Sequence, residues 1–155
     1  IFPQDIKGLT ILEGSNIPSD AVQNYDVKRE LSPRPHFLLD WIHHPEGKVL
    51  ALMDRSGECH GFGRIRPCLL KSGTGWRVGP LLADHPQLAE TLLRRLIVQH
   101  PGIILIDSPG LNTSVHSLLR KIGFISISET LRMYKGYQPP LSMDEVYGLA
   151  CLELG

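Results

Sequence analysis

The sequence predicts a mixed α/β fold, in which a mostly antiparallel sheet carries helices on both faces around a central parallel strand–helix–strand unit. Two apolar runs, 76–82 and 103–106, flank a segment whose apolar residues recur at helical spacing. The uninterrupted aliphatic run 103–106 is typical of a strand covered on both faces. A right-handed crossover through the helix makes the two strands parallel. Short strands and tight turns before residue 76 predict an antiparallel meander.

Tight turns divide the residues before the central unit into short elements. Ser19 or Asp20 is expected to cap a short helix. Gly57 stands late in a hairpin turn, where a positive φ is often needed. A second turn over 71–75 leads into the central unit. The expected elements are strands over 6–13, 48–53 and 59–70, and helices over 19–27 and 36–44.

The helix of the central unit is expected to begin at Asp84. Asp84 is the predicted N-cap, and Gln87 follows three residues later, as in a capping box. Pro86 fits the first turn, where its missing N–H has no intrahelical partner. The sequence His-Pro-Gly at 100–102 ends the helix. Its apolar face consists of Leu88, Leu92, Leu93, Leu96 and Ile97.

A second helix follows the turn at 107–110. Asn112 is its expected N-cap, and Gly123 supplies the left-handed residue that commonly ends a helix. Two further strands are expected over 125–134 and 146–154, paired with each other in antiparallel fashion. The apolar face of the helix consists of Val115, Leu118, Leu119 and Ile122.

The composition fits one globular domain over 1–155 in the cytoplasm, with 42% hydrophobic and 21% charged residues. The 16 basic and 16 acidic residues cancel, which argues against binding to nucleic acid or an anionic membrane. No apolar run is long enough to span a bilayer. The 3 cysteines lack metal-ligand spacing and no H-E-x-x-H occurs, so reduced thiols and no metal site are expected. Because the chain starts at Ile1 rather than Met, we expect a fragment that has lost an N-terminal domain.

The second helix carries a resemblance to a known family. Its residues are similar to the N-x-x-A-x-x-L-Y-x-K-x-G-F pattern of the GNAT acyltransferases, with Val for Ala and Leu119 for Tyr. The Val-Gly-Pro sequence at 78–80, followed by the helix through Leu92 and Leu93, resembles that family's central strand and cofactor helix. The tail over 132–136 and 147–155 also resembles the end of a tandem GNAT protein. The matching residues of the second helix are Asn112, Val115, Leu118, Lys121, Gly123 and Phe124.

The resemblance implies an N-acetyltransferase that uses acetyl-coenzyme A and a small-molecule amine, with the donor held where two strands splay apart. Backbone N–H groups around Leu81 and Leu82 are expected to polarise the thioester carbonyl. For the general base and acid, the weak candidates are Asp84, His85, Glu13 and Tyr134, and no spacing singles one out. The residues that the resemblance places against the cofactor are Val78, Gly79, Pro80, Leu81, Leu82, His85, Leu88, Ala89, Asn112, Val115 and Leu119.

The turn 83–89 departs from the family's Gln/Arg-x-x-Gly-x-Gly/Ala pattern, because it contains no glycine and no arginine. Pro86 removes one N–H donor, and a capping Asp84 would repel a pyrophosphate at the helix end. Leu119 cannot protonate a leaving thiolate. Two hypotheses therefore stay open. One is the acetyltransferase, and the other is a non-catalytic GNAT-fold domain that serves substrate binding, dimerisation or regulation.

Arg64 and Arg66 share one face of their predicted strand. Such a pair can hold an acidic group, although residues of this kind are more often solvated or paired. The acceptor itself has no diagnostic pattern in the sequence. A homodimer also stays open, because the final strand could pair across an interface.

Overall fold

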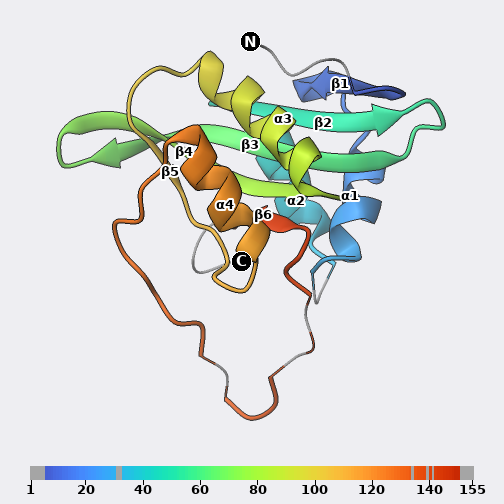
Figure 1. Ribbon diagram of the computed structural model, residues 1–155. Coiled ribbons are helices and arrows are strands. Elements are labelled where there is room, and N and C mark those ends of the chain that lie inside the picture. Colours follow the sequence, from blue (N-terminus) through green and yellow to red (C-terminus); the bar gives the residue numbers. More distant parts are fainter. Residues whose placement is uncertain (1–5, 31–32, 134, 139, 141, 151–155) are drawn as a thin grey trace.

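The computed structural model describes residues 6–30, 33–133, 135–138, 140 and 142–150. One six-stranded sheet carries α3 and α4 on one face and α1 and α2 on the other (Figure 1). This arrangement confirms the predicted fold class. The helices are α1 (Ser19–Val27), α2 (Pro35–His43), α3 (Pro86–Val98), α4 (Thr113–Ile122) and the short 3-10 helix η1 (Gly14–Asn16). The strands are β1 (Leu9–Glu13), β2 (Lys48–Asp54), β3 (Cys59–Leu70), β4 (Gly73–Ala83), β5 (Ile104–Ile106) and β6 (Val146–Gly148).

The first four strands form the predicted antiparallel meander, in the order β1-β2-β3-β4. Gly57 has a φ of 86° in the turn between β2 and β3, as its position in the hairpin suggested. Each face of the sheet covers its own apolar cluster, one under α3 and α4 and the other under α1 and α2. Among the described residues, no helix is both long enough and apolar enough to cross a bilayer.

Two predicted helix caps are wrong. Ser19 and Asp20 are the first residues of α1, and Pro18 occupies the cap position without a side-chain hydrogen bond. The cap position of α3 belongs to His85, so Asp84 is not the N-cap and the capping box does not form. Asp84 instead accepts hydrogen bonds from charged and hydroxyl donors on α1 and β3, which outcompete the helix N–H groups for its carboxylate.

The caps of α4 are as predicted. The Asn112 Oδ1 accepts a hydrogen bond of 3.2 Å from the N–H of Val115. Gly123 ends the helix in the left-handed region, with a φ of 106°. These two residues fix both ends of α4 against the sheet.

The central crossover is confirmed, because β5 pairs parallel to β4, with 104–106 opposite 76–78. The expectation that β5 is covered on both faces is wrong. All three of its residues are half-buried, and the preceding Ile103 is 53% exposed. The reason is that β5 is the last strand on its side of the described sheet and contacts β4 for only three residues.

The two last predicted strands do not pair with each other. Residues 124–133 form no strand and extend away from the body of the protein (Figure 1). Their apolar side chains Ile125, Ile127, Leu131 and Met133 are exposed. The described part of the final strand, β6, pairs antiparallel with β4 instead, because β4 has an open edge beyond the residues that β5 covers. Tyr134 and residues 151–154 of these predictions lie outside the described part of the chain.

Candidate functional site

The strands β4 and β5 are paired only as far as Val78 and Ile106. Beyond this point residues 144–149, here called the inserted segment, lie along the open edge of β4. Leu81 is opposite Gly148 and Leu82 is opposite Val146. The inserted segment therefore fills the gap in which the resemblance places a cofactor.

Hydrogen bonds hold the inserted segment on both sides of this gap. On the β4 side the N–H of Ala83 donates to the carbonyl of Glu145 at 3.1 Å. On the β5 side the N–H of Leu149 donates to the carbonyl of Asp107 at 2.7 Å. The Asn112 side-chain amide donates to the Val146 carbonyl at 2.9 Å, so the residue that caps α4 also anchors the segment.

Two glycines allow the inserted segment to approach closely. Gly79 has a φ of 156°, and a Cβ at this position would lie 2.0 Å from the carbonyl oxygen of Leu149. A Cβ on Gly148 would lie 3.2 Å from the Ile106 side chain. Any larger residue at position 79 would therefore clash with the backbone of the segment.

Tyr147 is the most deeply buried side chain of the inserted segment. It is fully buried in the cluster under α3 and α4, and its hydroxyl has no hydrogen-bond partner among the described residues. Burial and the nearby carboxylates of Glu145 and Asp144 raise its pKa to about 12. A buried, unpaired hydroxyl costs on the order of 1–3 kcal/mol, so the segment is held less tightly than its apolar contacts alone would allow.

The cofactor residues implied by the resemblance are brought together around this gap, but most of their side chains point into the core. Gly79 and Pro80 lie at the start of the gap and His85 is exposed beyond its far end. Asn112 is buried and bonded to the inserted segment. The buried apolar members are Val78, Leu81, Leu82, Leu88, Ala89, Val115 and Leu119.

A hydrogen-bonded group at the end of β4, here called the Asp84 cluster, joins the ends of four elements. It consists of Tyr25, Arg29, Asp54, His60 and Asp84. His60 bridges two carboxylates, with Nδ1 2.7 Å from Asp84 Oδ2 and Nε2 2.8 Å from Asp54 Oδ2. The Tyr25 hydroxyl and the Arg29 guanidinium donate to the other Asp84 oxygen at 2.8 and 3.1 Å.

The Asp84 cluster holds its charges in fixed states. Hydrogen bonds from Ser56 and His60 keep the pKa of Asp54 far below its usual value. The bond to Asp54, and then the bond to Asp84, raises the pKa of His60. Asp84 contacts three partners, with Tyr25 and Arg29 on one carboxylate oxygen and His60 on the other. The cluster is therefore suited to orienting α1 and the end of β4 rather than to accepting a proton.

The other weak candidates for acid–base work differ in their surroundings. The His85 ring is exposed, with Nδ1 3.0 Å from the Gln87 Oε1. Glu13 lies 3.2 Å from the Lys48 ammonium group, at the far edge of the sheet. Tyr134 lies outside the described residues. The described chain does not bring His85, Glu13 and Asp84 together by any hydrogen bond or ion pair.

Asp54, Glu58 and His60 place possible metal ligands within 4.8 Å of one another. Both nitrogens of His60 already bond to carboxylates, so hydrogen bonding accounts for this group.

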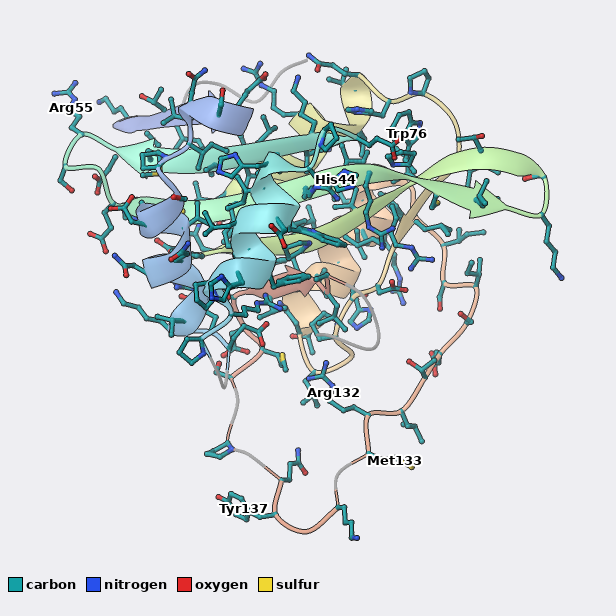
Figure 2. The ribbon with its side chains drawn as sticks, turned by 180° about the vertical axis from the view of Figure 1, so that it is seen from behind. His44, Arg55, Trp76, Arg132, Met133 and Tyr137 are labelled. Carbon is teal, nitrogen blue, oxygen red and sulfur yellow. The ribbon has the colours of Figure 1, made fainter. Side chains whose placement is uncertain are left out.

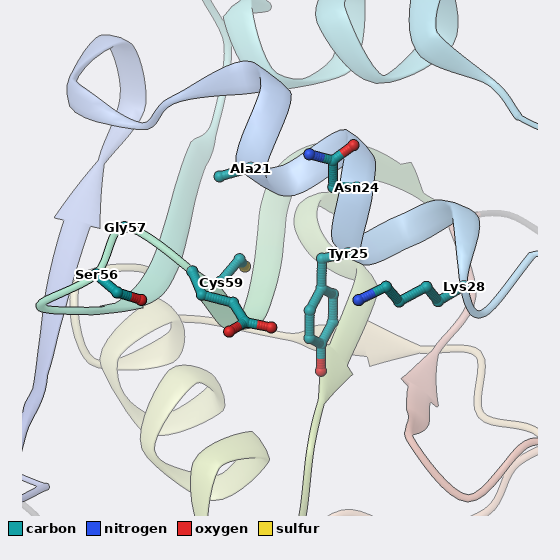
Figure 3. A pocket seen from close by; sticks show the side chains of 8 residues that line it. Ala21, Asn24, Tyr25, Lys28, Ser56, Gly57 and Cys59 are labelled. Atoms are coloured by element: carbon teal, nitrogen blue, oxygen red, sulfur yellow. The ribbon is translucent and has the colours of Figure 1, made fainter.

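An adjacent cavity of about 310 Å³ opens between α1 and the turn before β3 (Figure 3). Burial raises the pKa of its Cys59 thiol to about 11, so the thiol stays protonated near neutral pH. The cavity is lined by Ala21, Asn24, Tyr25, Lys28, Ser56, Gly57, Glu58 and Cys59.

The face of the sheet under α2 carries a second charged feature, here called the arginine pair. Arg64 and Arg66 of β3 place their guanidinium carbons 4.8 and 5.3 Å from the centre of the Trp41 ring. The indole N–H of Trp41 donates to the carbonyl of Gly79 at 3.3 Å. The shared face of the two arginines was evident from the sequence, whereas the contact with Trp41 depends on how α2 packs.

Comparisons with known proteins agree with this geometry. Residues 22–148 match the family model "Acetyltransferase (GNAT) domain". The chain is 31% identical over 150 residues to the holothin acyltransferase of Pseudoalteromonas sp. (strain SANK 73390), covering 96% of this chain and 49% of that protein.

Solved structures of similar fold include an acetyltransferase-class protein of Pyrococcus horikoshii. Its TM-score is 0.71 at 22% identity, over 98% of this chain and 47% of that one. An aminoglycoside N-acetyltransferase, AAC(6')-Iy in complex with CoA, has a TM-score of 0.63 at 10% identity, over 82% of this chain and 94% of that one. The chain thus spans about half the length of the holothin acyltransferase and of the Pyrococcus horikoshii protein.

Proposed function

Because this chain belongs to the GNAT acetyltransferase family, we propose that it is an acyltransferase domain that moves an acetyl group from acetyl-coenzyme A to the amine of a small molecule. The observation that carries the proposal is the family match over residues 22–148. This range includes the central β4–α3–β5 unit, helices on both faces of the sheet and residues 144–148 of the inserted segment.

The named relatives support acyl transfer to small amines. One is named for acylation of holothin, and one for N-acetylation of aminoglycosides. These names describe those proteins, and they differ too much in acceptor to specify one here.

The donor does not fit while the inserted segment lies on β4. The Ala83 N–H and the edge around Leu81 and Leu82, which would face a bound thioester, are paired with residues 145–148. The closest approach is at Gly79, where even a Cβ would meet the segment. We therefore propose that the donor binds only when the inserted segment leaves the edge of β4.

The beginning of α3 is better suited to phosphate than the sequence suggested. Asp84 is not the cap, and its charge is balanced by Arg29 and by His60, whose pKa is raised by the bonds to Asp54 and Asp84. The repulsion expected between a capping carboxylate and a pyrophosphate is therefore reduced. The N–H groups of the first turn of α3 and its helix dipole favour an anion there.

The thioester of acetyl-coenzyme A would supply the activated acetyl group. The chain contributes the walls of the gap, with Gly79 allowing close approach of a backbone or ligand. Asn112, which now holds the inserted segment through its side-chain amide, becomes free to donate to a ligand when the segment leaves. The Asp84 cluster keeps α1 against the end of β4 throughout.

The test is release of free thiol from acetyl-coenzyme A by the purified chain in the presence of a panel of primary amines. We expect amine-dependent thiol release, with a mass increase of one acetyl group on the acceptor. A Gly79→Val variant is expected to lose donor binding even though it also weakens the inserted segment, because its side chain would itself occupy the space that the donor needs. No turnover with any amine, and no binding of coenzyme A at millimolar concentration, would favour the non-catalytic alternative.

A further inference from the structure

Arg64 is a buried charge that forms no ion pair with a carboxylate of the described residues. It is 2% exposed, and its Nη2 donates to the backbone carbonyl of Glu46. Its Nε has no hydrogen-bond partner among the described residues. Burial and the neighbouring Arg66 lower its pKa to about 10, and the charge of Glu46 only partly offsets them.

Arg66 stands beside Arg64 and is also incompletely satisfied. Its Nε is buried and has no hydrogen-bond partner among the described residues. The side chain as a whole is half-buried, so part of it can be reached from solvent. The two guanidinium groups lie against the same indole ring, so two positive charges are held close together where burial limits their contact with water.

Other half-buried arginines of the chain are paired with carboxylates. Arg29 contacts Asp84 and Glu145, and Arg77, directly across the β3–β4 ladder from Arg66, contacts Asp107. Because a buried charge without an opposite charge beside it is unfavourable, an external anion would be stabilised at the arginine pair.

We propose that the arginine pair binds an acidic group of the acceptor, so that the substrate of this domain is an amine that also carries a carboxylate. Guanidinium groups present N–H donors in a fixed fork that matches a carboxylate. The ring of Trp41 contacts both guanidinium groups, and its indole N–H donates to the carbonyl of Gly79, the residue at which the β4 gap begins. The acidic group would thus be held beside the end of the gap where β4 and β5 are still paired.

The position of the pair argues against the phosphates of the donor as its ligand. Arg66 lies opposite Arg77, and β4 continues for six residues from there to Ala83 before α3 begins. At a strand rise of about 3.3 Å per residue, Arg66, the accessible member of the pair, lies about 20 Å from the helix end that favours phosphate. One site for each anion is therefore the simpler arrangement.

The inference rests on the proposed function, and two measurements separate them. The first is transfer of acetyl groups to β-alanine and to β-alaninamide, which differ only in the acidic group. We expect wild-type kcat/KM to favour β-alanine by at least about tenfold, consistent with a charge-assisted contact. The variant Arg66→Gln is expected to lose this preference while it still acetylates the amide. Arg66→Lys, which keeps the charge but not the fork, is expected to lie between them.

The second measurement is calorimetric binding of succinate, with neutral succinamide as the comparison. Arg55→Gln is the matched control. Arg55 is an exposed arginine in the turn between β2 and β3 (Figure 2), and this turn precedes the first residue of β3, whereas the arginine pair lies in the middle of that strand. Wild type and the control should bind succinate and not succinamide, and Arg66→Gln should bind neither. If succinate binding follows this pattern while no amine is acetylated, the proposed function fails and the anion site stands.

Three results would overturn the inference. In the first, wild type treats the acid and the amide alike. In the second, Arg66→Gln and Arg55→Gln change succinate binding to the same extent. In the third, Arg66→Gln weakens binding of coenzyme A but leaves the acceptor preference unchanged, which would assign the pair to the phosphates of the donor.

Discussion

His60 shows how one residue organises the end of the sheet. Its two ring nitrogens bond to Asp54 and Asp84, so it ties the β2–β3 hairpin to the end of β4. The Asp54 bond, which is the larger influence, and the Asp84 bond raise its pKa, whereas partial burial opposes them. The charged imidazole is therefore favoured in the folded protein relative to the unfolded chain.

This pKa shift predicts a pH-dependent contribution of His60 to stability. A histidine whose pKa is raised on folding contributes fully below its unfolded pKa of about 6.5, and the contribution disappears as pH rises through the folded value. His60→Gln should therefore lower the free energy of unfolding by about 1 kcal/mol near pH 6, and by less near pH 9. Urea denaturation at both pH values measures the difference.

The exposed His43, at the end of α2, provides the control. His43→Gln should leave the free energy of unfolding almost unchanged at both pH values. A loss for His60→Gln that is constant or grows toward high pH would show that His60 is not held in its charged form between the two carboxylates.

At the scale of the element, the inserted segment is the feature that decides whether the β4 gap is open. Its Tyr147 side chain is fully buried, whereas the Tyr147 hydroxyl, which has no hydrogen-bond partner among the described residues, works against that burial. If the segment and the donor compete for β4, changes that weaken the segment must strengthen donor binding by raising the fraction of open molecules.

Two substitutions of Tyr147 are expected to act in opposite directions. Tyr147→Ala should lower the free energy of unfolding by about 3 kcal/mol and tighten coenzyme A binding, because the segment loses its anchor. Tyr147→Phe removes the unpaired hydroxyl and should raise stability by about 1 kcal/mol while weakening coenzyme A binding. Thermal unfolding and calorimetric titration give the two readouts. Parallel changes in stability and affinity would contradict competition for β4.

Local signals explain which elements the sequence predicted well. Asn112 begins α4 because its side chain can accept a hydrogen bond from a helix N–H, and Gly123 ends it because glycine adopts a positive φ readily. Both predictions are confirmed. The parallel pairing of β5 followed from the helical spacing between two apolar runs. Such features depend on neighbours within a few residues, which a single sequence displays directly.

Contacts between distant residues explain what the sequence did not predict. Asp84 looked like a cap, but its partners His60 and Tyr25 lie 24 and 59 residues away. The strand 146–148 pairs with β4 because β5 leaves that edge free after Val78, which is visible only once the sheet is assembled. The hairpin, which brings the ends of β2 and β3 together, was the one sequence signal that could have placed Asp54 near His60.

The whole molecule combines the antiparallel meander β1–β4 with the inserted segment, which folds back onto β4. Residues 124–133 lead away from the sheet and end at the exposed Met133, and Tyr137, further along the chain, is exposed as well (Figures 1 and 2). The inserted segment then returns to the centre of the sheet.

The most direct measurement of the central claim is amide hydrogen exchange with and without acetyl-coenzyme A. In the free protein the N–H groups of Leu149 and Ala83 should be protected, because both donate hydrogen bonds that hold the inserted segment. Addition of acetyl-coenzyme A is predicted to abolish the protection of Leu149 while Ala83, facing the donor, stays protected. Binding of the donor with Leu149 still protected would contradict displacement of the segment, and the absence of any binding would contradict the acyltransferase itself.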